Sequence, residues 1–517
     1  MNRRLRSIAV LAGATLLVSA FASCGGTSHG TASTTIPGVA SPSTPSGTAT
    51  EGVRLAAVRW VACNGQAGPK GFECATVLVP RDPKDPNLGT IGMAIDRARA
   101  SGSPTQRIGS LLINPGGPGE SGVDALPGFV SGMPKDLLQR FDVVGFDPPG
   151  VGRTAPITCL SSAGLAQYFH ENPAPTTAAG IATLVSEART FDEACEQRSG
   201  AKLPYVSTVD AAMDMDILRQ ELGDTKLSYL GFSYGTFLGA TYAELFPTHV
   251  RAMVLDGALD PAVPVLTEIE EQSAGLETQL HQFISTCTSN SSCPWKPGPN
   301  PEQWLESLFA RSAVSPLPAK GTTRTVGPAE VLYGTLWPLY FTSTWPDLET
   351  TLADASTGDG TDLLQEFDSY TGRNSDGSYS NLFEVNAAVD CLDQPAPTVA
   401  QIEAALPAAE AASPFFGATD LYGELGCAVW PVAATGTVGP IHAVGSPPIV
   451  VVGSTGDPVT PYRWAQSLAS QLQHGVLLTR VGDGHTAYFA SSCIRTDVDS
   501  YLITLTPPAA GTRCSSD

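Results

Sequence analysis

A serine flanked by glycines lies where an apolar run gives way to a helical pattern. Residues 231–235 read Gly-Phe-Ser-Tyr-Gly, after the apolar residues 227–230 and before a helical stretch over 236–246. A nucleophile elbow requires a strand, a tight turn and a helix in this order, because its glycines permit the strained backbone that projects the hydroxyl above the sheet. The pattern therefore predicts that Ser233 is a nucleophile, with a chance turn serine as the alternative.

A serine hydroxyl becomes a good nucleophile only when a base accepts its proton. Among the seven histidines, His485 directly follows a late apolar strand, in the sequence Gly-Asp-Gly-His-Thr. The carboxyl ends of parallel strands form the edge at which open α/β sheets build their sites. His249 and His474 precede strands and are expected at the opposite edge. We therefore predict His485 as the general base, with a structural histidine as the alternative.

The base needs an acid that holds its imidazole, and Asp457 is well placed for this. It stands in the turn 453–458, after the buried type of strand pattern at 449–452. It also falls between Ser233 and His485, in the chain order nucleophile, acid, base of G-x-S-x-G hydrolases. Asp256, which follows the apolar run 252–255, is the rival acid. A turn-capping role is the alternative for either aspartate.

A glycine-rich loop, Asn-Pro-Gly-Gly-Pro-Gly at 114–119, follows the apolar run 110–113. Glycines let the backbone approach a substrate, so one loop amide and the amide of Tyr234 are expected to form an oxyanion hole. We predict Gly117 as the loop donor. A phosphate-binding loop is a weak alternative because no Lys-Ser/Thr pair follows, and a merely flexible loop is another.

A sheet must position these residues. Apolar, β-branched runs predict strands, with helical stretches such as 209–222 between several of them, at 75–79, 90–95, 110–113, 142–146, 226–230, 252–255, 448–452 and 476–479. This alternation predicts an α/β fold with a mostly parallel central sheet. The strand pattern lapses over 260–444, which we interpret as an inserted, largely helical cap between two parts of the core, 56–259 and 445–517. A second independent domain is the alternative.

The N-terminal residues have the pattern of an export signal. Arg3, Arg4 and Arg6 precede an apolar stretch over 8–21, so residues 1–24 are expected to be a signal peptide. The segment ends in a lipobox-like sequence at Cys24, which predicts a lipid-anchored protein outside the cytoplasm. Plain cleavage and secretion is the alternative. Residues 25–55 are rich in Ser, Thr, Gly and Pro and are expected to form a flexible linker.

The cysteines support an oxidising compartment. Eleven is an odd number, and setting Cys24 aside leaves ten. These fall in sequence-local couples, which we expect to form five disulfides: Cys63 with Cys74, Cys159 with Cys195, Cys287 with Cys293, Cys391 with Cys427, and Cys493 with Cys514. Metal binding is the weaker interpretation, since neither a CxxC pair nor a histidine cluster accompanies them.

The chain is strongly acidic, with a formal charge of −21 at pH 7 and a pI near 4.7. Such a surface repels phosphate backbones and anionic membranes, so nucleic-acid binding is not expected. Any membrane association is expected through the N-terminal lipid only. The predicted chemistry needs no cofactor.

Taken together, the chain resembles the secreted actinobacterial α/β-hydrolases grouped with tripeptidyl aminopeptidases and proline iminopeptidase relatives. The resemblance covers most of the mature chain and rests on residues 72–76, 114–122, 147–153, 231–235, 456–458 and 484–485. It implies a cap between nucleophile and acid, and the removal of short peptides from free N-termini. Pro149 and Thr154 depart from the Arg and Ser that relatives often carry, which affects the expected substrate more than the reaction.

The leading hypothesis is therefore an exported serine peptidase, more specifically an aminopeptidase, that acts on peptide or protein substrates. A carboxylesterase or lipase of the cell envelope with the same triad is the first alternative, and a non-catalytic peptide-binding lipoprotein is the second. An aminopeptidase needs a carboxylate for the substrate ammonium. The early cap offers Glu268, Glu270, Glu271 and Glu277, although their spacing also suits the solvated face of a helix.

Overall fold

The computed structural model describes residues 58–63, 71–436 and 438–515. The predicted signal peptide, its lipobox cysteine Cys24 and the linker 25–55 lie outside the described residues. Within the described part of the chain, none of the helices is long and apolar enough to cross a membrane.

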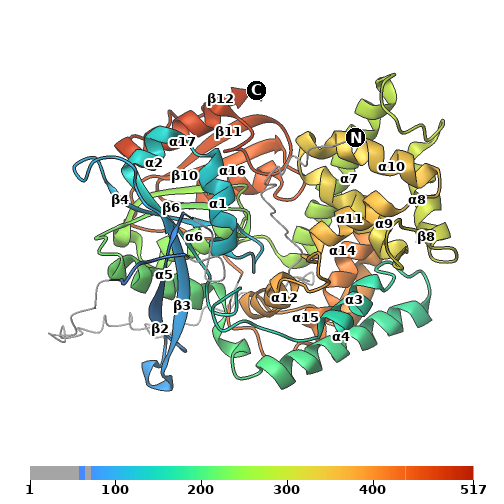
Figure 1. Cartoon of the computed structure of the whole chain (residues 1–517), viewed down its shortest axis with the longest axis horizontal. Coiled ribbons are helices and arrows are strands. Elements are labelled where there is room, and N and C mark those ends of the chain that lie inside the picture. Colours follow the sequence, from blue (N-terminus) through green and yellow to red (C-terminus); the bar gives the residue numbers. More distant parts are fainter. Residues whose placement is uncertain (1–57, 64–70, 437, 516–517) are drawn as a thin grey trace, which may run out of the picture.

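A single ten-stranded sheet forms the core, in the order β1-β2-β3-β5-β4-β6-β7-β10-β11-β12 (Figure 1). Pairing is parallel from β5 to β12 and antiparallel among β1, β2, β3 and β5. Each predicted strand overlaps a strand of this sheet, and the mostly parallel α/β fold is confirmed. The strands are β1 (Val61–Ala62), β2 (Glu73–Pro80), β3 (Thr90–Ala98), β4 (Gly109–Asn114), β5 (Phe141–Phe146), β6 (Leu227–Phe232), β7 (Val250–Asp256), β10 (Ile449–Gly456), β11 (Gly475–Asp483) and β12 (Arg513–Ser515).

The central strands are buried on both faces. Every residue of β4, β5 and β6 is buried, as expected for parallel strands covered by helices on both sides. Neighbouring residues in a strand point to opposite faces, so Leu111 and Val143 belong to one apolar cluster whereas Leu112 and Val144 belong to the other. The first cluster packs against α1 (Gly122–Gly132), α2 (Lys135–Arg140) and α17 (Ser492–Thr504). The second packs against α5 (Thr208–Glu221), α6 (Tyr234–Leu245) and α16 (Tyr462–Gln471).

A helical layer interrupts the sheet between β7 and β10, which are adjacent and parallel strands. Figure 1 shows these helices gathered beside the sheet rather than around it. This layer occupies the stretch that the sequence interprets as the cap. It contains α7 (Val265–Ser289), α8 (Pro301–Ser312), α9 (Pro328–Leu336), α10 (Trp345–Ser356), α11 (Thr361–Tyr370), α12 (Leu382–Asp393), α13 (Val399–Ala412), α14 (Gly417–Gly423), α15 (Leu425–Val429) and the short pair β8 (Leu317–Pro318) and β9 (Thr325–Val326).

Two further helices join this layer from the first half of the core. They are α3 (Ser162–His170), which contacts α9, and α4 (Ala178–Ser199), which contacts α15. Ala188 of α4 packs in one apolar cluster with Val265 and Ile402 of the cap. This stretch falls within the predicted core part, 56–259, and its association with the cap was not predicted.

Five disulfide bonds join the ten cysteines of the described chain, in the pairs that the sequence order predicts. One of them, Cys159–Cys195, ties α4 to the loop that follows β5. Another, Cys391–Cys427, ties α12 to α15 inside the cap. The helical layer is therefore covalently braced where it approaches the sheet.

Candidate active site

Ser233 occupies a strained turn between β6 and α6. Its backbone has φ 53° and ψ −124°, a left-handed region that non-glycine residues rarely adopt, and its side chain is fully buried. The flanking glycines are needed for close packing. A Cβ at Gly231 would lie 2.3 Å from the carbonyl oxygen of Gly235, and a Cβ at Gly235 would lie 2.8 Å from Oδ1 of Asn114. The local geometry is that of a nucleophile elbow.

Asp457 and His485 are directly paired. Nδ1 of His485 lies 2.9 Å from Oδ1 and 3.1 Å from Oδ2 of Asp457, and both side chains are buried. The carboxylate also accepts the amides of Val459, Thr460 and Thr486. A carboxylate held in this way fixes the tautomer in which Nδ1 carries the proton and Nε2 is free to accept one.

The other imidazole nitrogen remains available. Nε2 of His485 is buried and has no hydrogen-bond partner among the described residues. The end of β7 connects it to the elbow: the amide of Ser233 donates to the carbonyl of Asp256 at 2.9 Å, and a Cβ on the next residue, Gly257, would lie 3.2 Å from Cε1 of His485. The structure therefore brings the predicted nucleophile and base to the same strand end.

Asp256, the rival acid, contacts the backbone rather than the imidazole. Its carboxylate accepts the amides of Ala487 and Tyr488 at 2.8–3.1 Å. Burial raises the pKa of Asp256 to about 6, although these amides favour the charged form. These contacts fix the loop that follows His485, so Asp256 helps to position the base without touching its imidazole.

The glycine-rich loop packs against the elbow. A Cβ at Gly116 would lie 3.0 Å from Cβ of Ser233 and 3.4 Å from the amide nitrogen of Tyr234. Oδ1 of Asn114 accepts the amide of Gly116 and so shapes the turn. Gly116 and Gly117 both have positive φ. The backbone at Gly116 and the first amide of α6 thus lie beside the nucleophile, and backbone amides at such a position can stabilise an oxyanion.

The cap reaches the site at two places. The carbonyl of Tyr340 accepts the amide of His485 at 2.7 Å, and the two rings meet edge to face at 5.8 Å. At the second place, the hydroxyl of Tyr234 bonds to Thr208, whose hydroxyl donates to Asp393 of α12. The positions of the base and of the residue after the nucleophile are therefore both coupled to the cap.

A group of carboxylates surrounds this second contact. Burial and the charges of Asp393, Glu424 and Glu268 raise the pKa of Asp390 well above its usual range. Burial, with a contribution from Asp210, raises the pKa of Asp393 to about 7, although its hydrogen bonds with Thr208 favour the charged form. Burial and the charge of Glu424 likewise raise the pKa of Glu268. Asp390 and Glu268 keep part of their surface accessible, and no Lys or Arg of the described chain forms an ion pair with either.

Only one of the four early-cap glutamates considered from the sequence lies in this group. Glu268 does, whereas Glu270 is exposed on the same helix. Glu271 binds Arg463 and Trp464, and Glu277 binds Ser413. Asp390, Asp393 and Glu424 were not predicted from the sequence. Nothing in the local pattern of α12, or of the junction between α14 and α15, indicates that these carboxylates lie close together or that Asp390 and Asp393 approach Tyr234.

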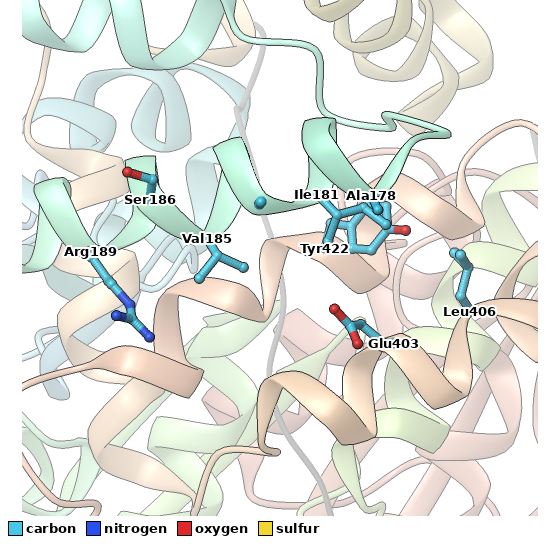
Figure 2. Close-up of a pocket in the computed structure, with 9 residues that line it drawn as sticks. Ala178, Ile181, Val185, Ser186, Arg189, Glu403, Leu406 and Tyr422 are labelled. Carbon is cyan, nitrogen blue, oxygen red and sulfur yellow. The ribbon is translucent and has the colours of Figure 1, made fainter.

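A separate cavity of about 670 Å³ lies away from this chemistry, between α4 and α13 (Figure 2). Ile181 and Val185 line one side and Leu406 the other, with Arg189 and Glu403 at its margin.

Three compact groups of potential metal ligands occur among the described residues. Each of them includes two cysteines that are joined in a disulfide. A disulfide offers no thiolate to a metal.

Comparison with known proteins gives two family matches. Residues 109–296 match the α/β hydrolase fold, and residues 413–514 match the family described as TAP-like protein. The two matches together include every residue of the predicted triad and oxyanion hole.

Several curated proteins are similar over most of their length. Serine protease Hip1 of Mycobacterium tuberculosis is 38% identical over 88% of this chain and 91% of its own. Carboxylesterase B of the same organism is 37% identical, with 86% of each chain covered. Tripeptidyl aminopeptidase of Streptomyces lividans is 31% identical over 89% of this chain and 87% of its own.

Proposed function

The chain is a serine peptidase that belongs to the TAP-like family of α/β-hydrolases, and we propose that it acts outside the cytoplasm as an aminopeptidase. The observation that carries the proposal is the combination of a His485–Asp457 pair beside the Ser233 elbow with carboxylates of the cap near Tyr234, of which Asp390 has no cationic partner in the described chain. The first part supplies acyl transfer to water, and the second supplies recognition of a positive charge on the substrate.

The proposed mechanism begins with attack of the Ser233 hydroxyl on a peptide carbonyl while Nε2 of His485 takes its proton. Asp457 holds the imidazole and stabilises its positive charge, and the amides of Gly117 and Tyr234 bind the oxyanion. The imidazolium then protonates the departing amine, which leaves an acyl ester on Ser233. Water, deprotonated by the same imidazole, hydrolyses this ester and restores the enzyme.

The aminopeptidase assignment rests on the charge of the cap interior. Asp390 and Glu268 lie among like charges and lack a cationic partner in the described chain, so burial and repulsion disfavour their ionised forms. A substrate ammonium placed among them would restore the ionised forms and gain charge-assisted hydrogen bonds. The Streptomyces relative is named a tripeptidyl aminopeptidase, which supports the same assignment.

The proposed location rests on two features. Five disulfides are typical of proteins that fold in an oxidising compartment. The N-terminal sequence fits a cleaved signal followed by lipidation at Cys24, with residues 25–55 as a tether. We infer attachment to the outer face of the cell membrane, with release into the medium as the alternative.

An esterase is the second candidate function, because one relative is named carboxylesterase B. Ester and peptide hydrolysis pass through the same tetrahedral intermediate, so the triad alone does not separate them. The cap carboxylates favour the peptidase, since a neutral acyl ester offers them no positive charge.

The test compares tripeptide coumarin amides that have a free or an acetylated N-terminus. We expect kcat/KM to be at least about tenfold higher for the free amine, because one charge-assisted hydrogen bond contributes about 1.5 kcal/mol or more. Asp390→Asn and Glu268→Gln should reduce this ratio. Glu270→Gln, which removes an exposed charge from the same helix, should leave it unchanged.

Two results would contradict the proposal in different ways. Equal cleavage of free and acetylated peptides would remove the aminopeptidase assignment while leaving a peptidase. Turnover of acyl esters without turnover of any amide would favour the esterase.

A further inference from the structure

A cavity of about 860 Å³ opens beside the glycine-rich loop 114–119, here called the oxyanion loop, where three distant segments meet. Gly119 and Glu120 contribute from the end of the loop, and Arg153 from the loop after β5. The cap contributes Tyr379 and also Leu382, which is the first residue of α12. The cavity therefore lies between the core and the cap, at the same interface as the triad.

The glycine-rich loop connects this cavity to the reacting centre. Gly116 packs against Ser233, and three residues later a Cβ at Gly119 would lie 2.7 Å from the carbonyl oxygen of Leu382. Helix α12 thus begins at the cavity and ends at Asp393, which approaches Tyr234 through Thr208. Eleven steps of 1.5 Å give about 16 Å between these ends, the length of about five extended residues.

Among the acids that line this cavity, Glu120 is the one without an ion-pair partner in the described chain. Its Oε2 atom is buried and makes no hydrogen bond with any described residue. Burial raises the pKa of its carboxyl to about 8. Arg153, the cation in the same cavity, is already bound to Asp124 at 2.7 Å and lies 3.9 Å from Asp147.

We propose that Glu120 is the specificity residue of a subsite that binds the basic side chain of a lysine or arginine in the peptide substrate. This rests on the proposed peptidase function and adds a second charged subsite to it, at the end of α12 opposite the cap carboxylates. An acidic guest is disfavoured because Asp124 and Asp147 already balance the positive charge of Arg153. A cationic guest is favoured because it would stabilise the ionised form of Glu120, which has no cationic partner in the described chain. The shared chemistry is a cation, which a side chain or an N-terminal ammonium can supply, and the test separates the two.

The test is a lysine scan. Pentapeptides with a free N-terminus carry lysine at one position at a time, and norleucine, which has the same shape but no charge, replaces lysine in the reference peptide. For the wild type we expect one position at which lysine raises kcat/KM about tenfold or more. Glu120→Gln should abolish this preference while cleavage of the norleucine peptide continues. Glu302→Gln, which removes the same charge from an exposed position on α8, should keep it.

Three results would overturn the inference. They are a lysine preference that survives in Glu120→Gln, the absence of preference at every position, and a preference that vanishes when the N-terminus is acetylated, which would assign the cation to the ammonium. Failure of the proposed peptidase activity itself would give a different result, because the wild type would then cleave none of the peptides.

Fluorophosphonate labelling of Ser233 shows whether Glu120→Gln has folded. If that variant fails to label, inhibition of the wild type decides. Non-cleavable lysine peptides should inhibit about tenfold more tightly than their norleucine equivalents, and equal inhibition would contradict the inference.

Discussion

Two buried aspartates lie near the base, and their contacts give them different roles. Asp457 binds the imidazole of His485, whereas Asp256 binds the amides of the next loop. The chain order of the motifs leaves both aspartates open, since each follows a strand of the parallel sheet. Only the geometry of the loops distinguishes them.

The first prediction concerns this distinction. Asp457→Asn should lower kcat about 10³–10⁴-fold, because the amide favours the wrong imidazole tautomer. Asp256→Asn should cost roughly tenfold or less, because it disturbs the loop and not the imidazole. Steady-state kinetics of both purified variants measure the difference. A larger loss in Asp256→Asn would reverse the assignment.

The three triad residues that the sequence predicted share one property. Ser233, Asp457 and His485 each stand in a short motif directly after a strand, so local pattern and chain order locate them. Asp390 stands in no such motif, and Glu120 lies in a motif whose glycines alone carried the prediction. Their surroundings arise from contacts with distant segments: the charge of Glu268 acts on Asp390, and Leu382 of the cap packs against Gly119 beside Glu120. A single sequence does not encode such contacts locally.

The oxyanion loop is the element on which the proposed catalysis depends most. Gly116 has φ 116°, and a Cβ there would lie 2.8 Å from the carbonyl oxygen of Phe232. Since backbone atoms cannot yield as a flexible side chain does, Gly116→Ala should shift the loop away from the elbow. We expect kcat to fall about 10²-fold or more, the loss typical of a missing oxyanion donor.

Gly223 provides a matched control for this second prediction. It has φ 79°, also positive, but a Cβ there meets nothing within 4 Å. Gly223→Ala should cost about 1–2 kcal/mol of stability for the left-handed backbone and leave kcat unchanged. If both variants lost activity alike, general strain rather than displacement of the loop would explain the effect.

The sheet was predictable element by element because buried parallel strands are continuous apolar, β-branched runs. The strands that were not predicted, β1, β8, β9 and β12, have only two or three residues each, which is too few for a pattern. The helices α3 and α4 were missed as part of the cap layer for another reason. Their sequences indicate helices but not the partner against which they pack.

The whole molecule contains many buried carboxyls, which makes its stability depend on pH. Asp192 of α4 is 3% exposed, and neither carboxylate oxygen has a hydrogen-bond partner in the described chain. Burial, and to a lesser extent Glu193, raise its pKa to about 8. The folded state therefore binds a proton that the unfolded chain releases near pH 4, so this residue destabilises the fold progressively as pH rises from about 4 to 8.

A third prediction follows for Asp192→Asn, which keeps the shape and removes the titration. The melting temperature should rise by roughly 2–5 °C at pH 8. It should remain unchanged at pH 4, where the side chain at position 192 is uncharged in both folded proteins. Thermal unfolding at the two pH values checks this. An equal shift at both would mean that the side chain acts through packing rather than charge.

The central claim is an assembled triad with Ser233 as its nucleophile, and fluorophosphonate labelling of the purified mature protein tests it most directly. Stoichiometric labelling that is lost in Ser233→Ala and strongly slowed in His485→Ala is the predicted result. Absence of labelling in the folded wild type, or labelling that persists in Ser233→Ala, would contradict the account.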